Sequence, residues 1–208
     1  MPKKIAQANI ISFMLIIGLS LFLVAGTFYW LLPTIREINS LNDVKSIERQ
    51  MLTLHNAITQ VSREKSQRTV PININKGTIR VRDDSIFYKG FYHLPEAEKG
   101  NEILVYGGIN VTTSSGGNRL NCSRGTIGRL GFDEPACLLR KGSVEIELRY
   151  LHLNDTFTGN IYRIKFRTSK RSHGGPESRY INVEWVNRTI REDGDKRNTT
   201  SYIAVDIY

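Results

Sequence analysis

Residues 1–33 read MPKKIAQANIISFMLIIGLSLFLVAGTFYWLLP and decide the fold of this chain. A short basic segment leads into a run from Ile10 to Leu32 that contains no charged side chain. At a rise of about 1.5 Å per residue, this run makes about 35 Å of apolar helix, enough to cross a hydrocarbon core of about 30 Å. It is too long for the apolar core of an ordinary secretory signal peptide, and no A-x-A cleavage motif follows it. A standard cleaved secretory signal is therefore disfavoured.

The basic flank of this run predicts its orientation. Lys3 and Lys4 keep the N-terminal flank in the cytoplasm by the positive-inside rule, so the rest of the chain is expected outside the membrane. Two interpretations fit this arrangement. One is an uncleaved signal anchor, and the other is a precursor whose short leader is removed before the apolar helix.

An amphipathic helix is expected after the apolar run. Pro33 lacks a backbone N–H and its ring clashes with the preceding turn, so a kink or a restart is predicted there. Ile35, Ile38 and Leu41 project to one side, where they face either other helices of an assembly or the head of the same chain. Later apolar residues fall within an arc of about 100°, which predicts a stripe packed on a globular head. These residues are Val44, Ile47, Met51, Leu54, Ile58 and Val61.

From about residue 70 the hydrophobic pattern changes to period two. Strict alternation of apolar and polar residues indicates antiparallel sheets with one buried and one wet face, and Asp193-Gly194 predicts a hairpin turn. The fold class is therefore predicted as α+β, with a long N-terminal helix, half apolar and half amphipathic, carrying an antiparallel β-sandwich or barrel-like head. The predicted strands are 70–75, 78–82, 85–88, 102–106, 109–113, 144–150, 162–166, 181–185 and 202–207.

Charge does not by itself assign a ligand. The formal net charge is +9, but Arg and Lys alternate with Glu and Asp along much of the chain. A solvated basic face explains this better than nucleic-acid binding, which is disfavoured. The acidic pair Glu145 and Glu147 is expected to lie opposite Arg163, Lys165 and Arg167 on a neighbouring strand, in preference to a ligand-binding stripe.

The two cysteines, Cys122 and Cys137, lie in the predicted head. An exported head would meet an oxidising compartment, so a single disulfide closing a short loop is expected. In the chain-entropy model such a loop contributes about 3 kcal/mol. Neither cysteine has a His or a second Cys at metal-ligand spacing, so a metal site is not expected.

Five N-x-[ST] sequons lie in the predicted head and none in the helix. Chance predicts roughly two, so the excess favours an N-glycosylated, extracytoplasmic surface, although one or two can remain unused. The sequon of Asn121 is the weakest, because its middle residue is Cys122. The predicted glycosylation sites are Asn110, Asn121, Asn154, Asn187 and Asn198.

No set of residues has the spacing of a catalytic or cofactor site. The histidines, His55, His93, His152 and His173, are scattered, and no G-x-S-x-G or H-E-x-x-H motif occurs. His55 is interpreted as a polar edge residue of the amphipathic helix. The chain is therefore not expected to be an enzyme or to hold a cofactor, with a surface enzyme or a nucleic-acid receptor as the rival hypothesis.

The junction KKIA/QANIISF resembles the class III signal of archaeal type IV pilins and archaellins. In that family a basic patch, a small residue and commonly a Gln precede the apolar helix. Matched residue by residue, Lys3 and Lys4 are the basic patch, Ala6 is the last leader residue and Gln7 is the new N-terminus. Bacterial pilins usually have Glu at the fifth mature position, where this chain has Ile11, and this departure fits many archaeal members better.

The resemblance implies insertion in the cytoplasmic membrane with the head outside, leader removal by a prepilin peptidase, and extraction by an assembly ATPase into a homo-oligomeric cell-surface filament. Such a filament is held together by its bundled helices and can contact surfaces or neighbouring cells. The filament-core residues would be Ile11, Leu15, Leu19 and Phe22. The implied segments are a leader (1–6), a transmembrane and filament-core helix (7–33), an amphipathic helix (34–66) and a head (70–208). The alternative is an uncleaved single-pass anchor whose β-sandwich binds the cell envelope or a filament base.

Overall fold

The computed structural model describes residues 2–92, 102–107, 111–113, 120–122, 125–130, 136–141, 145–167 and 171–208. Within these ranges only the backbone is described for residues 2–11, 102–103, 107, 111–113, 120–122 and 125–128.

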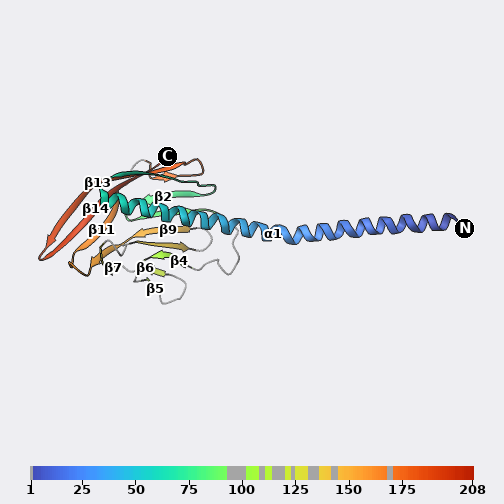
Figure 1. Cartoon of the computed structure of the whole chain (residues 1–208), viewed down its shortest axis with the longest axis horizontal. Helices are drawn as coiled ribbons and strands as arrows, with labels where there is room; N and C mark the ends of the chain where they lie inside the picture. Colours follow the sequence, from blue (N-terminus) through green and yellow to red (C-terminus); the bar gives the residue numbers. More distant parts are fainter. Residues whose placement is uncertain are drawn as a thin grey trace.

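One helix, α1, runs from Pro2 to Glu64 and is the longest element of the described chain. Its N-terminal part projects away from the head, and its C-terminal part lies along the head (Figure 1). We call residues 12–32 the free half and residues 44–61 the embedded half. The helix ends where Lys65 adopts a left-handed backbone conformation with φ of 53°, which is a common helix terminus.

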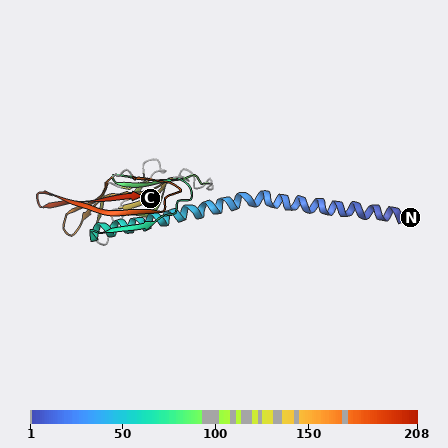
Figure 2. The same ribbon diagram turned by 90° about the horizontal axis from the view of Figure 1, so that it is seen from above.

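Pro33 lies inside α1, so of the two outcomes predicted at this residue, a kink or a restart, the restart is wrong. The helix continues through the proline and bends only gently between the free part and the part on the head (Figure 2). A proline removes one helical hydrogen bond, and a bend relieves the clash of its ring with the preceding turn. Because Pro33 is exposed, no packed neighbour opposes this bend.

The rest of the described chain forms short strands that make up the head (Figure 1). Nine of them correspond to predicted strands, with bounds that agree within a few residues except that the last two are much longer than predicted. The strands at 120–122, 125–128, 136–141, 152–155 and 173–174 have no predicted counterpart. In chain order, the strands are β1 (Gln67–Pro71), β2 (Thr78–Arg82), β3 (Ser85–Lys89), β4 (Glu102–Gly107), β5 (Val111–Thr113), β6 (Leu120–Cys122), β7 (Gly125–Gly128), β8 (Ala136–Lys141), β9 (Glu145–Tyr150), β10 (His152–Asp155), β11 (Ile161–Arg167), β12 (His173–Gly174), β13 (Tyr180–Asp193) and β14 (Lys196–Ile207).

The strands form two six-stranded sheets and a small hairpin. Sheet A has the order β1-β13-β14-β11-β10-β7, sheet B has the order β12-β2-β3-β9-β8-β4, and β5 pairs with β6. Most pairs are antiparallel, as predicted, but β11 pairs with β14 and β10 pairs with β7 in parallel. The hairpin predicted at Asp193-Gly194 is confirmed, since Asp193 pairs with Lys196 and Gly194 has φ of 60°.

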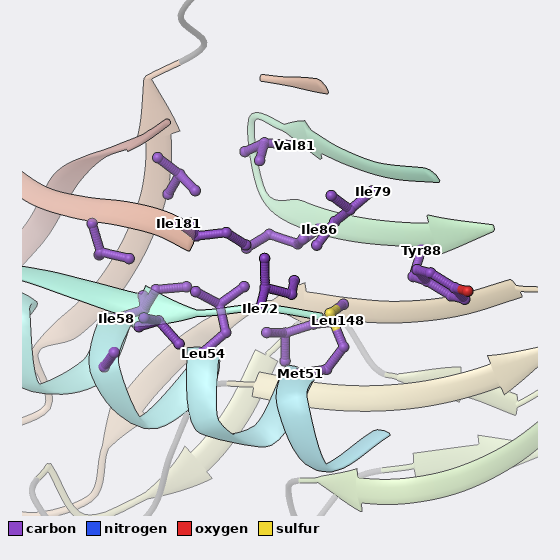
Figure 3. Close-up of a cluster of buried hydrophobic side chains, with 14 of the residues drawn as sticks. Met51, Leu54, Ile58, Ile72, Ile79, Val81, Ile86, Tyr88, Leu148 and Ile181 are labelled. Carbon is purple, nitrogen blue, oxygen red and sulfur yellow. The ribbon is translucent and has the colours of Figure 1, made fainter. Parts of the chain in front are cut away.

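The core lies between the two sheets and α1 (Figure 3). All six residues of the predicted stripe, from Val44 to Val61, are buried, which confirms that the embedded half packs on the head. Ile35 and Ile38 are exposed, whereas Leu41 is half-buried against the core. The sheets contribute the alternating apolar residues of their facing sides, including Ile79, Val81, Ile86, Ile146, Leu148, Ile181, Val183, Ile203 and Val205.

His55 is not the edge residue that the sequence predicted. Its side chain is buried in the embedded half, with Nδ1 lying 2.9 Å from the hydroxyl oxygen of Tyr150 on β9. Its ring lies 5.3 Å from the ring of Tyr106 on β4. The prediction is wrong because the partners of His55 come from strands about 50 and 95 residues away in the sequence, beyond the reach of a helical-face argument.

The predicted pairing of acidic and basic strands is also wrong. Strand β9 lies between β3 and β8 in sheet B, whereas β11 lies between β10 and β14 in sheet A. Glu147 instead pairs with Lys141 at 2.8 Å and with Arg149 at 2.6 Å, both from sheet B. The basic residues of β11 therefore lie opposite other strands, with Arg163 facing His152 and Thr200.

Candidate functional site: the exposed apolar half of α1

The free half of α1 exposes its large apolar side chains to solvent. Phe22 is 75% exposed and Tyr29 is 86% exposed, and every large apolar residue from Phe13 to Leu32 is at least 38% exposed. None of the apolar segment beginning at Ser12 is buried within the chain, and it is long and apolar enough to span a membrane. Soluble monomers rarely expose so continuous an apolar surface. The free half could therefore span a membrane.

The predicted filament-core residues lie on this exposed surface. Leu15, Leu19 and Phe22 are exposed, and at about 100° per residue their spacing places them on one face of the helix. Ile11 belongs to α1, but its side chain lies outside the described residues. Leu15 and Leu19 flank a shallow groove at Gly18. This groove is a place where a second helix can approach the backbone closely.

Two hydroxyl groups of the free half, those of Ser20 and Thr27, are satisfied within the helix. The Ser20 hydroxyl donates to the carbonyl oxygen of Ile16 at 2.8 Å, and the Thr27 hydroxyl donates to that of Leu23 at 2.7 Å. Such bonds remove the cost of exposing a hydroxyl to an apolar medium. The free half is therefore chemically compatible with a bilayer or with a bundle of apolar helices.

The predicted leader junction lies within α1. The backbone of Lys3, Lys4, Ala6 and Gln7 is helical, and the side chains of these residues lie outside the described ones. Cleavage between Ala6 and Gln7 thus stays a prediction. Because α1 begins at Pro2, the junction and the free half form one continuous helix in this chain.

The embedded half is fastened to the head by polar contacts in addition to its apolar stripe. Glu48 pairs with Arg140 of β8 at 3.2 Å, and both side chains are nearly buried. Gln50 accepts a hydrogen bond from the backbone N–H of Asn73 at 2.7 Å. These contacts fix the rotation of the helix on the head. The direction in which the free half leaves the head is consequently set by the fold.

Three predicted glycosylation sites share the outer face of sheet A, the face turned away from α1. Asn154 lies opposite Ile161, which lies opposite Asn198, and Asn187 lies opposite Tyr202 on the same side of the sheet. Asn187 is exposed, and Asn154 and Asn198 are half-buried. Asn110 and the side chain of Asn121 lie outside the described residues. These sites are far apart in the sequence, and the strand register places three of them on the same face of sheet A.

Cys137 is fully buried at the start of β8 and is not a free thiol. The side chain of Cys122, on β6, lies outside the described residues. The pairing of the two therefore stays a prediction.

The described residues contain no group of three His, Cys, Asp or Glu side chains arranged to hold a metal ion. His55 and His152 lie on different elements, His173 is exposed on β12, and His93 is outside the described ranges. Burial lowers the pKa of His152 below its ordinary value, and the neighbouring Arg163 lowers it further. Both effects favour the neutral form of the His152 ring.

Comparison with protein-family models, with curated proteins and with solved structures finds no match for this chain.

Proposed function

We propose that this protein is a structural subunit of an extracellular filament of the archaeal type IV pilus class, assembled through bundling of its N-terminal helices. One observation supports this proposal above the others. A single helix is embedded in the head over one half and bare over the other, although the bare half is the more apolar. Partners that cover the bare half of the helix would therefore come from outside this chain.

Neighbouring copies of the same helix are suitable partners for the free half. Lipid is as apolar as the helix, so leaving the bilayer requires close helix packing in compensation. The positions of Gly18 and Gly26 are open: apart from the adjacent residues and the backbone of the helix itself, no atom lies within 4 Å of where a Cβ would lie. Small residues of this kind let helix backbones approach one another closely.

The N-terminal junction supports the same proposal. Under it, a prepilin peptidase cuts between Ala6 and Gln7, the head stays outside the cytoplasmic membrane, and an assembly ATPase extracts the subunit into the filament. The basic residues Lys3 and Lys4 precede the apolar segment, as the positive-inside rule requires for this orientation.

The distribution of sequons fits a bundle with the helices inside. Asn154, Asn187 and Asn198 lie on the outer face of sheet A, while the inner face of that sheet packs toward α1. A glycan on this face would point away from the helical core. Glycosylation and helix bundling are therefore sterically compatible in one filament.

An uncleaved membrane anchor is the second candidate. It is favoured by the length of the free half, about 30 Å, which matches one bilayer core. In that case the head would bind the cell envelope or a filament base, and no bundle of helices would form.

Two measurements test the proposal. Cell-surface filaments are purified, imaged by electron microscopy and analysed for peptides of this chain, and the N-terminus of the mature protein is sequenced from filament and membrane fractions. We expect filaments that contain the chain, with a first residue of Gln7. A chain that keeps Met1 to Ala6, stays in the membrane fraction and is missing from every filament would overturn the proposal and favour the anchor.

A further inference from the structure

A cleft of about 640 Å³ lies where the outer faces of the two sheets meet. At this corner the chain crosses from sheet B to sheet A through the single residue Leu151, which joins β9 to β10. The β2–β3 turn closes the corner. The Tyr150 N–H donates to the carbonyl oxygen of Asp84, and the Phe166 N–H donates to that of Asp83, both at 2.7 Å. Since these bonds tie β9 and β11 to one turn, the cleft is preformed.

The charged residues that line the cleft are mostly basic. They are Arg82, Arg149, Arg163 and Lys165, with the carboxylates Asp84 and Glu147. Arg163 and Lys165, on the sheet A wall, are exposed, and neither forms an ion pair with another described residue. This wall therefore offers two cations whose charge is not neutralised within the described part of the chain.

The sheet B wall holds its arginines in place. Arg149 is bonded to Glu147 at 2.6 Å, and the Arg82 guanidinium lies 4.6 Å from the centre of the Phe87 ring. Ser85 lies directly between Arg82 and Arg149 across the strands, and its hydroxyl donates to Asp84 at 3.1 Å. Ser85 is itself buried, whereas Arg82 is exposed and Arg149 is half-buried. An anionic group in the cleft would thus meet these two arginines on the sheet B wall and Arg163 and Lys165 on the sheet A wall.

We propose that this cleft binds an anionic polysaccharide, through carboxylate or sulfate groups, on a surface that the head contacts. The four basic side chains would hold the anionic groups, and the exposed carboxylate of Asp84 would accept hydrogen bonds from sugar hydroxyls. Of the aromatic lining residues, Phe87 is covered by Arg82, Tyr150 is buried and His152 is half-buried, so the lining has no fully exposed aromatic ring for base stacking.

This inference requires the head to lie outside the cell but does not depend on filament assembly. It is tested on the full-length, unassembled chain in an uncharged detergent, so that its failure is distinguishable from a failure of the filament proposal. The probes are immobilised polygalacturonate, which is carboxylated, heparin, which is sulfated, neutral dextran, and single-stranded DNA. Binding is measured over a range of salt concentrations.

The decisive variant is Arg163→Glu/Lys165→Glu, and its matched control is Lys45→Glu/Lys196→Glu. The control changes the net charge equally at exposed positions away from the cleft. We expect the unmodified chain to bind polygalacturonate, heparin or both, and not dextran. The cleft variant should lose affinity by roughly tenfold or more, while the control stays within about twofold of the unmodified chain.

Comparison of the polygalacturonate and heparin arms then identifies carboxylate or sulfate as the recognised group. Absence of binding to both, or equal losses in the two double variants, overturns the proposal. It is also overturned if single-stranded DNA binds more tightly than either polysaccharide and shows the same dependence on Arg163 and Lys165. If the charge reversals unfold the head, which circular dichroism reports, Arg163→Gln/Lys165→Gln removes both charges at similar volume and carries the same expectations.

Discussion

The two halves of α1 are parts of one uninterrupted helix, yet the chain covers only one of them. The embedded half has a single apolar stripe, and exposed charged residues such as Lys45 and Arg49 occupy its other sides. The free half is apolar all round and touches nothing in its own chain. A helix with one apolar stripe needs one partner surface, which this chain provides, whereas a helix that is apolar on every side needs to be surrounded. The pattern of apolar residues thus distinguishes an internal partner from an external one.

The embedded half therefore contributes to the stability of the head, whereas the free half is available for contacts outside the chain. Burial of each large side chain of the embedded stripe stabilises the head by roughly 1.5–3 kcal/mol relative to exposure. The free half buries none of its side chains on folding of the head, so it makes no such contribution. Substitutions in the two halves should therefore have different and separable consequences.

The largest effect is expected in the free half, from Leu15→Asp. A carboxylate near the middle of an apolar segment costs about 2.5–3.5 kcal/mol in a bilayer and is equally out of place in a helical bundle. We expect complete loss of filaments in electron microscopy, with no change in the thermal unfolding midpoint of the head. Thr53→Asp, on an exposed position of the embedded half, is the control and should preserve filaments. Filaments of normal abundance from Leu15→Asp would show that the free half is not an assembly surface.

The next effect is expected in the embedded half, from Ile58→Ala. Ile58 is fully buried, so its truncation should lower the free energy of unfolding by about 2–5 kcal/mol. Chemical denaturation in detergent, followed by near-ultraviolet circular dichroism, measures this change. Leu23→Ala makes a comparable truncation in the free half and should leave the unfolding free energy of the head unchanged. Equal losses from the two variants would contradict the division of α1 into two functional halves.

A smaller effect is expected from Glu48→Ala, which breaks the ion pair between the embedded half and β8. Arg140 would keep a nearly buried charge without this partner, so we expect a loss of about 1–3 kcal/mol in the same denaturation experiment. Glu64→Ala removes the exposed pair of Glu64 with Arg68 and should have no measurable effect. If Glu48→Ala behaves like Glu64→Ala, the apolar stripe alone holds the helix on the head.

Local patterns were sufficient to predict most elements of this fold. The period-two alternation in 78–82 and 85–88 predicted β2 and β3, because each strand buries one face and exposes the other. The helical stripe from Val44 to Val61 was predicted correctly for the same kind of reason. Such patterns record which side of an element is buried, and they do so without reference to the rest of the chain.

Local patterns gave wrong predictions where the partner of a residue or strand came from a distant segment of the chain. Glu147 and Arg163 lie on strands with complementary charge, but the chain assigns these strands to different sheets. His55 has a polar side chain on a helix, but its partner Tyr150 comes from β9. The alternation of a strand shows which face is buried and does not show which strand lies beside it.

The sequence by itself therefore determined that an apolar segment would remain uncovered, because a run without charge on any side cannot be satisfied by a single packed face. It also determined the stripe that fastens the helix to the head. Only the tertiary structure decided what the head presents to its surroundings. Sheet register placed Asn154, Asn187 and Asn198 on one face, and the crossing at Leu151 brought Arg149 and Arg163 to one cleft. These surfaces arise from contacts between residues far apart in the chain, which no local periodicity encodes.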